Sequence, residues 1–284
     1  MARKPVARIG LSAFAAVGLL LAGCGGNSGH EDGDHTGMHH DMAGMPGGDG
    51  LSAEASGLRF VPATETLPAG QPSEFRYAIT GSDGKPVTSF EPDQTKLMHF
   101  YLVRSDLTGF QHIHPTMAAD GTWSARLTPL QPGSYRAYAS FTPAATDAMP
   151  LVLSKQVIVP GEAALTALPV PAGTAAADGY TLTLSTDRFA SGTEQRFTVA
   201  VSRDGKPVNT LQPYLGTYAH LTAFRAGDLA FAHLHPHDDV RGDSGGPTLN
   251  FEAMLPAPGT WRLFLQFQTD GVLHTAATTV TVTG

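Results

Sequence analysis

Three histidines recur in the sequence with the same spacing, and their pattern suits a metal ion. A first histidine is followed by twelve residues, a second histidine, one further residue, a third histidine and a proline. The residues are His99, His112 and His114 in the first set and His220, His233 and His235 in the second. The second and third histidines of a set point to the same face of a strand, because side chains alternate. Imidazole nitrogens bind zinc or copper, so each set is a candidate metal site.

The segment between the first two histidines of a set predicts a β-hairpin that brings the three rings to one face. In the first set this segment contains residues 104–109, whose Ser, Asp and Gly are typical of a turn. A turn centred near residues 106–107 places His99 opposite His112 or His114, with Cβ atoms about 4.5–5.5 Å apart. The other face is expected to enter the core, with Phe100, Leu102 and Ile113 in the first hairpin and Leu221, Ala223 and Leu234 in the second.

Other interpretations of these histidines stay open. A slip of one residue in strand pairing would move the first histidine to the opposite face. Each ring could also be a structural residue that forms hydrogen bonds within its hairpin. The two sets could hold separate ions, or face each other and share one. His237, Asp238 and Asp239 follow the second set and could add ligands.

Residues 24–56 have a composition that can collect metal ions but does not favour folding. The segment contains no lysine or arginine and few large apolar side chains. It therefore buries too little surface to offset the loss of chain entropy, and we expect a disordered tether. Its candidate metal ligands are His35, Met38, His39, His40, Met42 and Met45, with His30, Asp32, Asp34 and Asp41 among them. A polar spacer that is rich in histidine is the alternative.

The stretch Gly37-Met38-His39-His40-Asp41-Met42 resembles the His/Met-rich segments of bacterial copper-resistance proteins. The resemblance is one of composition and is confined to the tether. It implies copper as the ion, ahead of zinc. Copper also stands highest in the affinity order of nitrogen-donor sites, and thioether ligands favour its reduced form.

A tandem duplication carries the two histidine sets. The pentapeptide at residues 83–87, Asp-Gly-Lys-Pro-Val, recurs 121 residues later, and the same offset relates His99 to His220. We expect one copy at residues 57–159 and the other at residues 179–284. A linker rich in Pro, Ala and Gly, residues 160–178, joins them. A repeat of this length indicates two copies of one structural unit.

Each copy is expected to form about seven short strands. In the first copy these are residues 58–62, 74–80, 96–104, 110–115, 122–127, 134–141 and 151–159. Seven short strands in about 100 residues predict an immunoglobulin-like β-sandwich, so the fold class is all-β with two such domains in tandem. The step Pro132-Gly133-Ser134-Tyr135, matched by Pro258-Gly259-Thr260-Trp261, resembles the entry to a late strand of such a domain. With one cysteine in the chain, no internal disulfide can form.

Residues 1–23 resemble the signal peptide of a lipoprotein. Three basic residues precede an apolar run, residues 9–21, that is too short to span a bilayer comfortably. The run ends in Leu21-Ala22-Gly23-Cys24, which resembles a bacterial lipobox. The resemblance implies lipidation of Cys24 with acyl chains such as palmitate, cleavage before it, and a protein anchored in the cell envelope on the extracytoplasmic side of the membrane. An ordinary signal peptide with a chance cysteine is the alternative.

The charge of the chain argues against nucleic acid as a partner. The formal net charge is −7, and removal of residues 1–23 takes away three basic residues and no acidic one, which makes it −10. Nucleic-acid binding depends on basic surfaces that neutralise phosphates. An acidic protein attracts cations instead.

One motif points to an enzyme, but its context does not. Residues 242–247, Gly-Asp-Ser-Gly-Gly-Pro, match the sequence around the nucleophile of chymotrypsin-like serine proteases. That chemistry needs a base histidine and an orienting aspartate placed far from the serine in the sequence, and Ser244 lies in a loop that the first copy lacks. A copper-zinc superoxide dismutase needs an intrachain disulfide, which one cysteine cannot form. We therefore predict a protein that is not an enzyme.

The predicted function is that of an extracytoplasmic lipoprotein that binds copper, or else zinc, for sequestration, buffering or transfer. The expected partners are the membrane, through the lipid, the metal ion, and another protein of the envelope. In architecture and ligand type the two domains resemble small secreted β-sandwiches of bacterial metal homeostasis, such as the copper-resistance proteins. The alternative is an interaction module, in which tandem immunoglobulin-like domains present a surface to an envelope protein and the histidines are structural.

Overall fold

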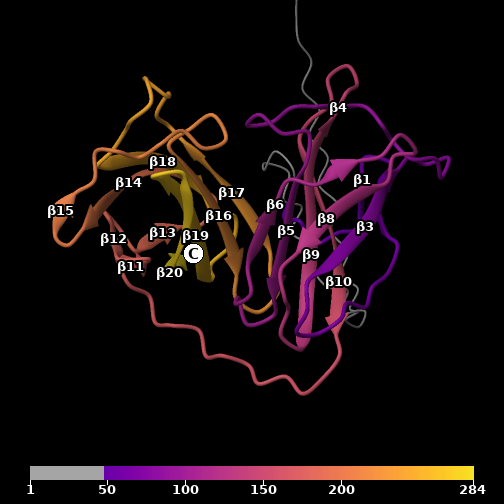
Figure 1. The fold of residues 1–284 in the computed structure, drawn as a ribbon, viewed down its shortest axis with the longest axis horizontal. Helices are drawn as coiled ribbons and strands as arrows, with labels where there is room; N and C mark the ends of the chain where they lie inside the picture. Colours follow the sequence, from indigo (N-terminus) through magenta and orange to yellow (C-terminus); the bar gives the residue numbers. More distant parts are fainter. Residues whose placement is uncertain (1–47) are drawn as a thin grey trace, which may run out of the picture. The chain divides into compact units, whose positions relative to one another are not determined.

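A computed structural model of the chain describes residues 48–284, in which every regular element is a β-strand. The described part contains no helix that is long and apolar enough to cross a membrane. The fold is all-β, with two tandem immunoglobulin-like sandwiches, and this confirms the predicted fold class (Figure 1). The predicted signal peptide, Cys24 and the tether ligands His35, Met38, His39, His40, Met42 and Met45 lie outside the described residues.

The first sandwich consists of two sheets. Its strands are β1 (Glu54–Ala55), β2 (Leu58–Pro62), β3 (Ser73–Thr80), β4 (Phe90–Glu91), β5 (His99–Arg104), β6 (Gln111–Ile113), β7 (Thr116–Met117), β8 (Trp123–Leu127), β9 (Gly133–Pro143) and β10 (Leu151–Val159). One sheet has the order β1-β2-β3-β8-β7 and the other the order β10-β9-β5-β6, with β4 paired to β9. Phe60, Phe75 and Trp123 are fully buried in the core between the sheets. All seven strands predicted for this copy are present, with ends that differ by a few residues.

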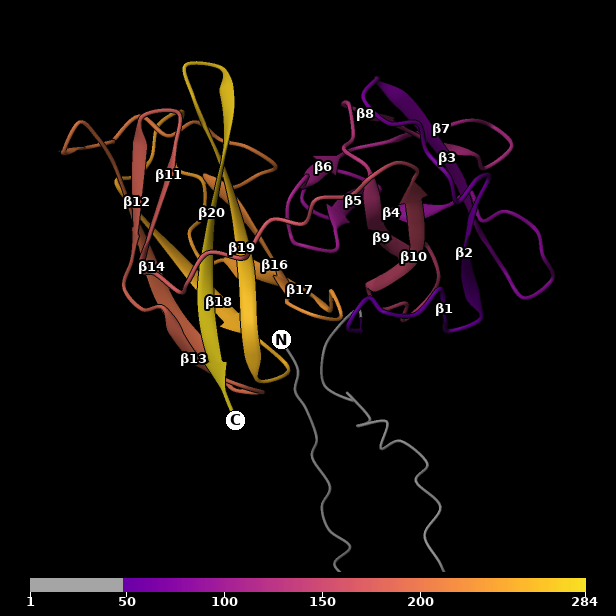
Figure 2. The same cartoon turned by 90° about the horizontal axis from the view of Figure 1, so that it is seen from below.

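The second sandwich repeats this arrangement. Its strands are β11 (Thr174–Ala177), β12 (Tyr180–Leu184), β13 (Arg188–Ala190), β14 (Glu194–Arg203), β15 (Lys206–Pro207), β16 (Ala219–Arg225), β17 (Phe231–Pro236), β18 (Thr248–Met254), β19 (Gly259–Thr269) and β20 (Val272–Thr283). They follow one hydrogen-bonded path, β11-β12-β14-β18-β17-β16-β19-β20-β13, with β15 paired to β14. Strands β19 and β20 form a long hairpin that is clear in Figure 2. Phe197, Phe251 and Trp261 lie in the core.

The His-x-His-Pro motif lies where the chain passes from one sheet of a sandwich to the other. In the first sandwich β6 pairs with β5, whereas β7 pairs with β8, and His114 and Pro115 separate the two. Proline has no N–H to donate to a ladder, so it suits such a break. In the second sandwich β17 makes the same passage without a break, because its first residues pair with β16 and its last two pair with β18.

A corner motif starts the corresponding strands β9 and β19. The hydroxyl of Tyr135 donates a hydrogen bond to the carbonyl of Gln131 (2.9 Å), and the indole N–H of Trp261 donates to the carbonyl of Ala257 (3.0 Å). An aromatic residue that bonds back to the chain a few residues upstream is a hallmark of immunoglobulin-like domains. The prediction that the Pro-Gly-x-aromatic step enters a late strand is therefore confirmed.

An apolar cluster joins the outer faces of the two sandwiches. This interface cluster contains Tyr101, Val103, Leu107, Tyr138 and Val152 of the first sandwich and Phe224, Leu229, Phe231 and Phe264 of the second. Every residue of β5 is buried, and because side chains alternate, Phe100 enters the first core while Tyr101 enters the interface cluster. The ring of Tyr101 lies 5.2 Å from that of Phe231, between centroids. Each large side chain buried in this way contributes about 1.5–3 kcal/mol.

Residues 48–56, which the sequence assigned to the disordered tether, belong to the fold. The carbonyl of Asp49 accepts the backbone N–H of Phe231 (2.8 Å) in the second sandwich. The carbonyl of Gly50 accepts the hydroxyl of Ser154 in the first, and the carbonyl of Ser52 accepts the N–H of the same residue (2.8 Å). Backbone hydrogen bonds order this segment, and composition does not reveal them.

The linker predicted at residues 160–178 is likewise held to the fold. The guanidinium of Arg104 donates to the carbonyl of Ala164 (2.6 Å), and the side chain of Leu168 packs against the interface cluster. The last residues of the predicted linker form β11. Its contacts come from side chains distant in sequence, so its Pro- and Gly-rich composition could not predict them.

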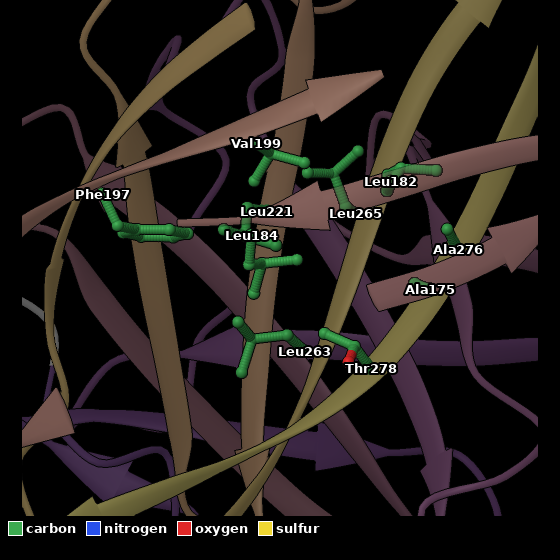
Figure 3. Close-up of a pocket in the computed structure, with 10 residues that line it drawn as sticks. All are labelled: Ala175, Leu182, Leu184, Phe197, Val199, Leu221, Leu263, Leu265, Ala276 and Thr278. Atoms are coloured by element: carbon green, nitrogen blue, oxygen red, sulfur yellow. The ribbon is translucent and has the colours of Figure 1, made fainter. Parts of the chain in front are cut away.

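The core of the second sandwich contains a small cavity of about 10 Å³ (Figure 3). Its lining is apolar apart from Thr278 and includes Leu182, Phe197 and Leu265. A cavity of this size holds about one water molecule at most, and an apolar one stays dry. It is a packing gap and not a ligand site.

We predict that Gly50→Val lowers the free energy of unfolding by about 2–4 kcal/mol, since it combines backbone strain with overpacking. The φ of Gly50 is +68°, and a Cβ there would lie 3.0 Å from Phe231 Cβ and 3.1 Å from Val152 Cγ1. Gly57→Ala is the matched control, because Gly57 also has a positive φ (+74°) but open space around it. Urea unfolding measures both changes, and an equal loss in the two variants would contradict the account of the interface.

Candidate metal centre

Strands β5 and β6 place two histidines of the first sandwich, His99 and His112, on the face that looks away from its core. Phe100 pairs with Ile113 and Tyr101 with His112, so the pairing has no slip that would separate His99 from His112. Phe100 lies in the core, and Ile113 packs against it. The opposite face therefore carries His99, Tyr101 and His112, as the alternation predicts.

Strands β16 and β17 repeat this register in the second sandwich. Leu221 pairs with Leu234 and Thr222 with His233, and both leucines enter the core. His220 lies one residue before Leu221 and has no exposed surface. The backbone of His235 pairs with Glu252 of β18. The side chains of His233 and His235 lie outside the described part of the structure.

The two histidine faces meet, and three rings converge. One ring nitrogen each of His99, His112 and His220 lies within 4.8 Å of those of the other two. Among the side chains that the structure describes, no other group of three or more His, Cys, Asp or Glu residues converges in this way. We call these three residues the histidine cluster. Because it draws on both sandwiches, it corresponds to the shared arrangement that the sequence left open.

Hydrogen bonds on the outer side of each ring determine which nitrogens face inward. Nε2 of His99 lies 3.0 Å from the carbonyl of Asp93, which can only accept, so this nitrogen carries the proton and Nδ1 does not. Nδ1 of His112 lies 2.7 Å from Oε1 of Gln266, and Nδ1 of His220 lies 2.6 Å from Oε1 of Gln94. With those two nitrogens protonated, Nδ1 of His99, Nε2 of His112 and Nε2 of His220 are left with lone pairs.

Two of the inner nitrogens lie close together. Nδ1 of His99 and Nε2 of His112 are 3.0 Å apart. A contact this short requires a proton or a metal ion between the two nitrogens, because two lone pairs repel at this distance. Burial favours the neutral rings, since it lowers the pKa of His99 despite the neighbouring Asp93 carbonyl and carboxylate.

Tyr101 closes the cluster on the side of the interface. Its ring stacks on that of His112, with 4.4 Å between centroids, and its hydroxyl lies 3.0 Å from Nε2 of His220. Burial raises the pKa of Tyr101 well above its usual value, so the phenol keeps its proton and donates to His220. This contact confirms that Nε2 of His220 acts as an acceptor in the metal-free protein.

His114 lies at the edge of the cluster with one ring nitrogen unused. Its ring meets those of His99 and His112 edge-on, at centroid distances of 5.1 and 4.7 Å. Its Nε2 is buried and has no hydrogen-bond partner among the described residues. Burial, with smaller effects of His99 and Lys96, lowers the pKa of His114 to about 3. It is a fourth nitrogen donor within reach of a small ring movement.

The separations in the histidine cluster are near those that a metal ion requires. Nitrogens bound at about 2.0–2.1 Å to a tetrahedral ion lie about 3.3 Å from each other. The observed range, from 3.0 Å between His99 and His112 to at most 4.8 Å, encloses this value. An ion bonded to all three nitrogens requires the loss of the Tyr101 hydrogen bond, because that bond uses the lone pair of His220 Nε2.

The candidate ligands that follow the second set do not join the cluster. His237 is exposed and lies beside a polar surface cleft of about 520 Å³, together with Asp238 and Asp239. The carboxylate of Asp238 accepts hydrogen bonds from the side chain and backbone of Asn250 (2.8 Å each). The register explains the separation, because β17 has by then crossed to β18.

Ser244 of the protease-like motif lines the same cleft. The remaining histidine, His274, is buried and bonded to Asp178 (2.8 Å) and Thr269 (2.9 Å). Its two ring nitrogens are both satisfied, as in a structural histidine.

Three residues that surround the histidine cluster were not predicted from the sequence: Gln94, Gln266 and Tyr101. Gln94 and Gln266 contact histidines distant in sequence, and neither belongs to a motif. Tyr101 could have been found, because the run His99–Arg104 is almost continuously apolar. Such a run indicates a strand that is buried on both faces.

Comparison with known proteins yields a family and a set of structures with similar architecture. A family model described as "Domain of unknown function (DUF8832)" matches residues 53–150 and 175–284. No curated protein sequence matches the chain. The matched ranges leave out the His/Met-rich residues 30–45 of the tether, so the family match does not bear on their resemblance to copper-resistance proteins.

The solved structures to which the chain is similar include bacterial adhesins and an S-layer protein. They include the adhesin FdeC of Escherichia coli (18% identity, TM-score 0.26, 81% of this chain and 65% of that one) and domains 4 and 5 of the S-layer protein SbsC (15%, 0.26, 82% and 100%). The adhesin InvE of Yersinia pseudotuberculosis is a third (14%, 0.24, 82% and 61%). Identities and TM-scores this low carry no argument about function.

We predict that the free energy of unfolding of the metal-free protein falls as the pH drops from about 6.5 toward 3. In this window the unfolded chain, with a histidine pKa of about 6.5, binds a proton that His114 in the folded chain does not. The stability that His114 contributes is therefore complete above pH 6.5 and is lost as the pH falls. Urea unfolding with a chelator present should show a shallower pH slope in His114→Gln than in the wild type, and the wild-type slope in His237→Gln. Equal slopes in all three proteins would show that burial does not depress this pKa.

Proposed function

The chain belongs to the DUF8832 family of domains of unknown function, and we propose a function for it from the histidine cluster. The proposal is that the chain binds a transition-metal ion between its two sandwiches. The ligands are His99, His112 and His220, with His114 as the nearest further donor. The observation that carries the proposal is the convergence of three ring nitrogens, with Nδ1 of His99 and Nε2 of His112 3.0 Å apart and an oxygen acceptor behind each ring. A divalent cation at this point would bond to the converging nitrogens.

Structural histidines do not account for this arrangement equally well. A structural ring satisfies each nitrogen with its own partner, as His274 does with Asp178 and Thr269, and His220 is satisfied in the same way by Gln94 and Tyr101. In the histidine cluster the outer nitrogens have oxygen acceptors and the inner nitrogens converge. Ligand histidines in metal sites show this polarity, since their second nitrogen donates to a carbonyl or another oxygen.

Copper is the first candidate for the ion, and zinc is the second. The donors of the histidine cluster are neutral imidazoles, which suit Cu(II) and zinc. Nitrogen-donor sites generally bind Cu(II) more tightly than zinc. The methionines of the tether, Met38, Met42 and Met45, suit Cu(I). A protein with both donor types is fitted to sequester, buffer or transfer copper. We propose binding and not catalysis as its activity.

The test is metal titration of the mature full-length chain in which the His and Met residues of positions 30–45 are replaced by Asn and Leu. Calorimetry with Cu(II), Cu(I) and Zn(II) should find one ion per chain. His99→Asn/His220→Asn should abolish this binding, because it removes two of three ligands, while the control His237→Asn should retain it.

Absence of binding in the parent chain would contradict the proposed metal function. The histidines would then be structural, and the tandem sandwiches would be the interaction module that is the alternative. Binding that survives in the double variant would place the ion elsewhere in the chain.

We also propose that the protein is anchored to the membrane through a lipid on Cys24, on the support of the Leu21-Ala22-Gly23-Cys24 sequence. Cys24→Ser should move the protein from the membrane fraction to the soluble fraction of the producing bacterium and remove its partition into detergent. His237→Asn serves as a control that leaves the lipobox intact. A Cys24→Ser protein that stays with the membrane would refute the lipid anchor.

A further inference from the structure

Two glutamines reach across the boundary between the sandwiches, and each contacts a histidine of the other one. Gln94 lies between β4 and β5 of the first sandwich, and its Oε1 is 2.6 Å from Nδ1 of His220 in the second. Gln266 lies on β19 of the second sandwich, and its Oε1 is 2.7 Å from Nδ1 of His112 in the first. Each sandwich therefore supplies one glutamine acceptor to a histidine of the other sandwich.

Each amide oxygen selects one tautomer of the ring that it contacts. An amide oxygen only accepts, so the facing Nδ1 carries the proton and Nε2 is left with its lone pair toward the histidine cluster. The amide of Gln266 is itself oriented, because its Nε2 donates to the hydroxyl of Thr275 (3.3 Å). Gln266 is 4% exposed, so water does not compete for its oxygen.

The turn that carries Gln94 holds a histidine from each sandwich. Reciprocal backbone hydrogen bonds of 2.8 Å between Asp93 and Lys96 close this turn. Asp93 uses its carbonyl to accept from His99, and the next residue, Gln94, accepts from His220. Gln94 has a positive φ of 42°, which directs two successive residues at the same cluster. One turn of the first sandwich therefore fixes two of the three inner nitrogens.

We propose that Gln94 and Gln266 are positioning residues of the metal centre, and that the metal-competent tautomers of His112 and His220 are selected only when the two sandwiches are docked. This inference rests on the proposed metal function. Each sandwich supplies one histidine whose inner nitrogen is set by an acceptor of the opposite sandwich. The centre therefore requires both copies, for ligands and for the acceptors behind them.

The experiment uses the full-length chain with substituted tether ligands, with Cu(II) salt as the probe. Gln94→Met and Gln266→Met keep the length of the side chain but remove the acceptor. Each is expected to weaken Cu(II) binding by about 10–100-fold, the usual effect of losing a hydrogen bond behind a ligand. Gln94→Glu and Gln266→Glu retain an oxygen acceptor and should restore most of the affinity. Gln268→Met is the matched control, since Gln268 lies two residues along β19 and bonds to Gln212 (3.4 Å) outside the cluster.

A second readout does not involve metal and separates positioning from mere stability. Nitrogen NMR of the metal-free, folded protein reports which ring nitrogen carries the proton. The wild type should show Nδ1–H for His112 and His220 and Nε2–H for His99. Gln266→Met should shift His112 toward the other tautomer, Gln94→Met should do the same for His220, and Gln268→Met should change neither.

The outcomes distinguish the two proposals. Wild-type affinity and unchanged tautomers in the Met variants would overturn the positioning role and leave the metal function standing. A parent chain, with its tether ligands substituted and both glutamines intact, that binds no Cu(II) would overturn the metal function and this inference with it. Loss of affinity in the Met variants, restored by Glu and accompanied by the tautomer shifts, is the result that we expect.

Discussion

The burial of β5 and β16 on both of their faces is the constraint on which the rest of the structure depends. In each strand one set of alternating side chains fills its own sandwich, and the other set faces the opposite sandwich. A polar side chain on the second face must find a partner or a ligand there, because water cannot solvate it. His99 and His220 are 1% and 0% exposed in this position. The apolar contact that joins the sandwiches therefore also brings their histidines together and removes them from water.

The two copies carry equivalent faces, but they contribute different residues to the histidine cluster and its surroundings. His99 and His220 occupy equivalent places, but Tyr101 in the first copy corresponds to Thr222 in the second. Gln266 pairs with His220 in the ladder as Ser140 pairs with His99. The first copy thus lacks the counterpart of one glutamine, and the second lacks the tyrosine. Such asymmetry is expected where two related faces contribute to a single site and no longer need to be alike.

Periodicity predicted the strands and their faces, because it follows from the alternation of side chains within each strand. It placed Phe100 and Leu221 in the cores and the histidines on the other face. The docking of the two copies could not be predicted in the same way, since it depends on contacts between residues more than a hundred positions apart. The apolar runs of β5 and β16 carried a signal for it. Gln94 carried no such signal, because its contact with His220 depends on the geometry of a turn and on the docking of the two sandwiches.

The order of residues 48–56, at the end of the tether, could not be predicted from composition for a related reason. Asp49 and Gly50 are held by carbonyls that accept hydrogen bonds from both sandwiches. Any residue has such a carbonyl, so side-chain composition carries no trace of the contact. The predictions for Cys24 and for the metal ligands of the tether stay predictions, as does the role of His233 and His235.

Anomalous diffraction at the copper absorption edge, from crystals of the mature chain grown with Cu(II), tests the central claim most directly. The account predicts one ion bonded to Nδ1 of His99, Nε2 of His112 and Nε2 of His220, with the outer nitrogens still bound to Asp93, Gln266 and Gln94. Copper found only near His237 or on the tether, with the histidine cluster empty and its rings unmoved, would contradict it.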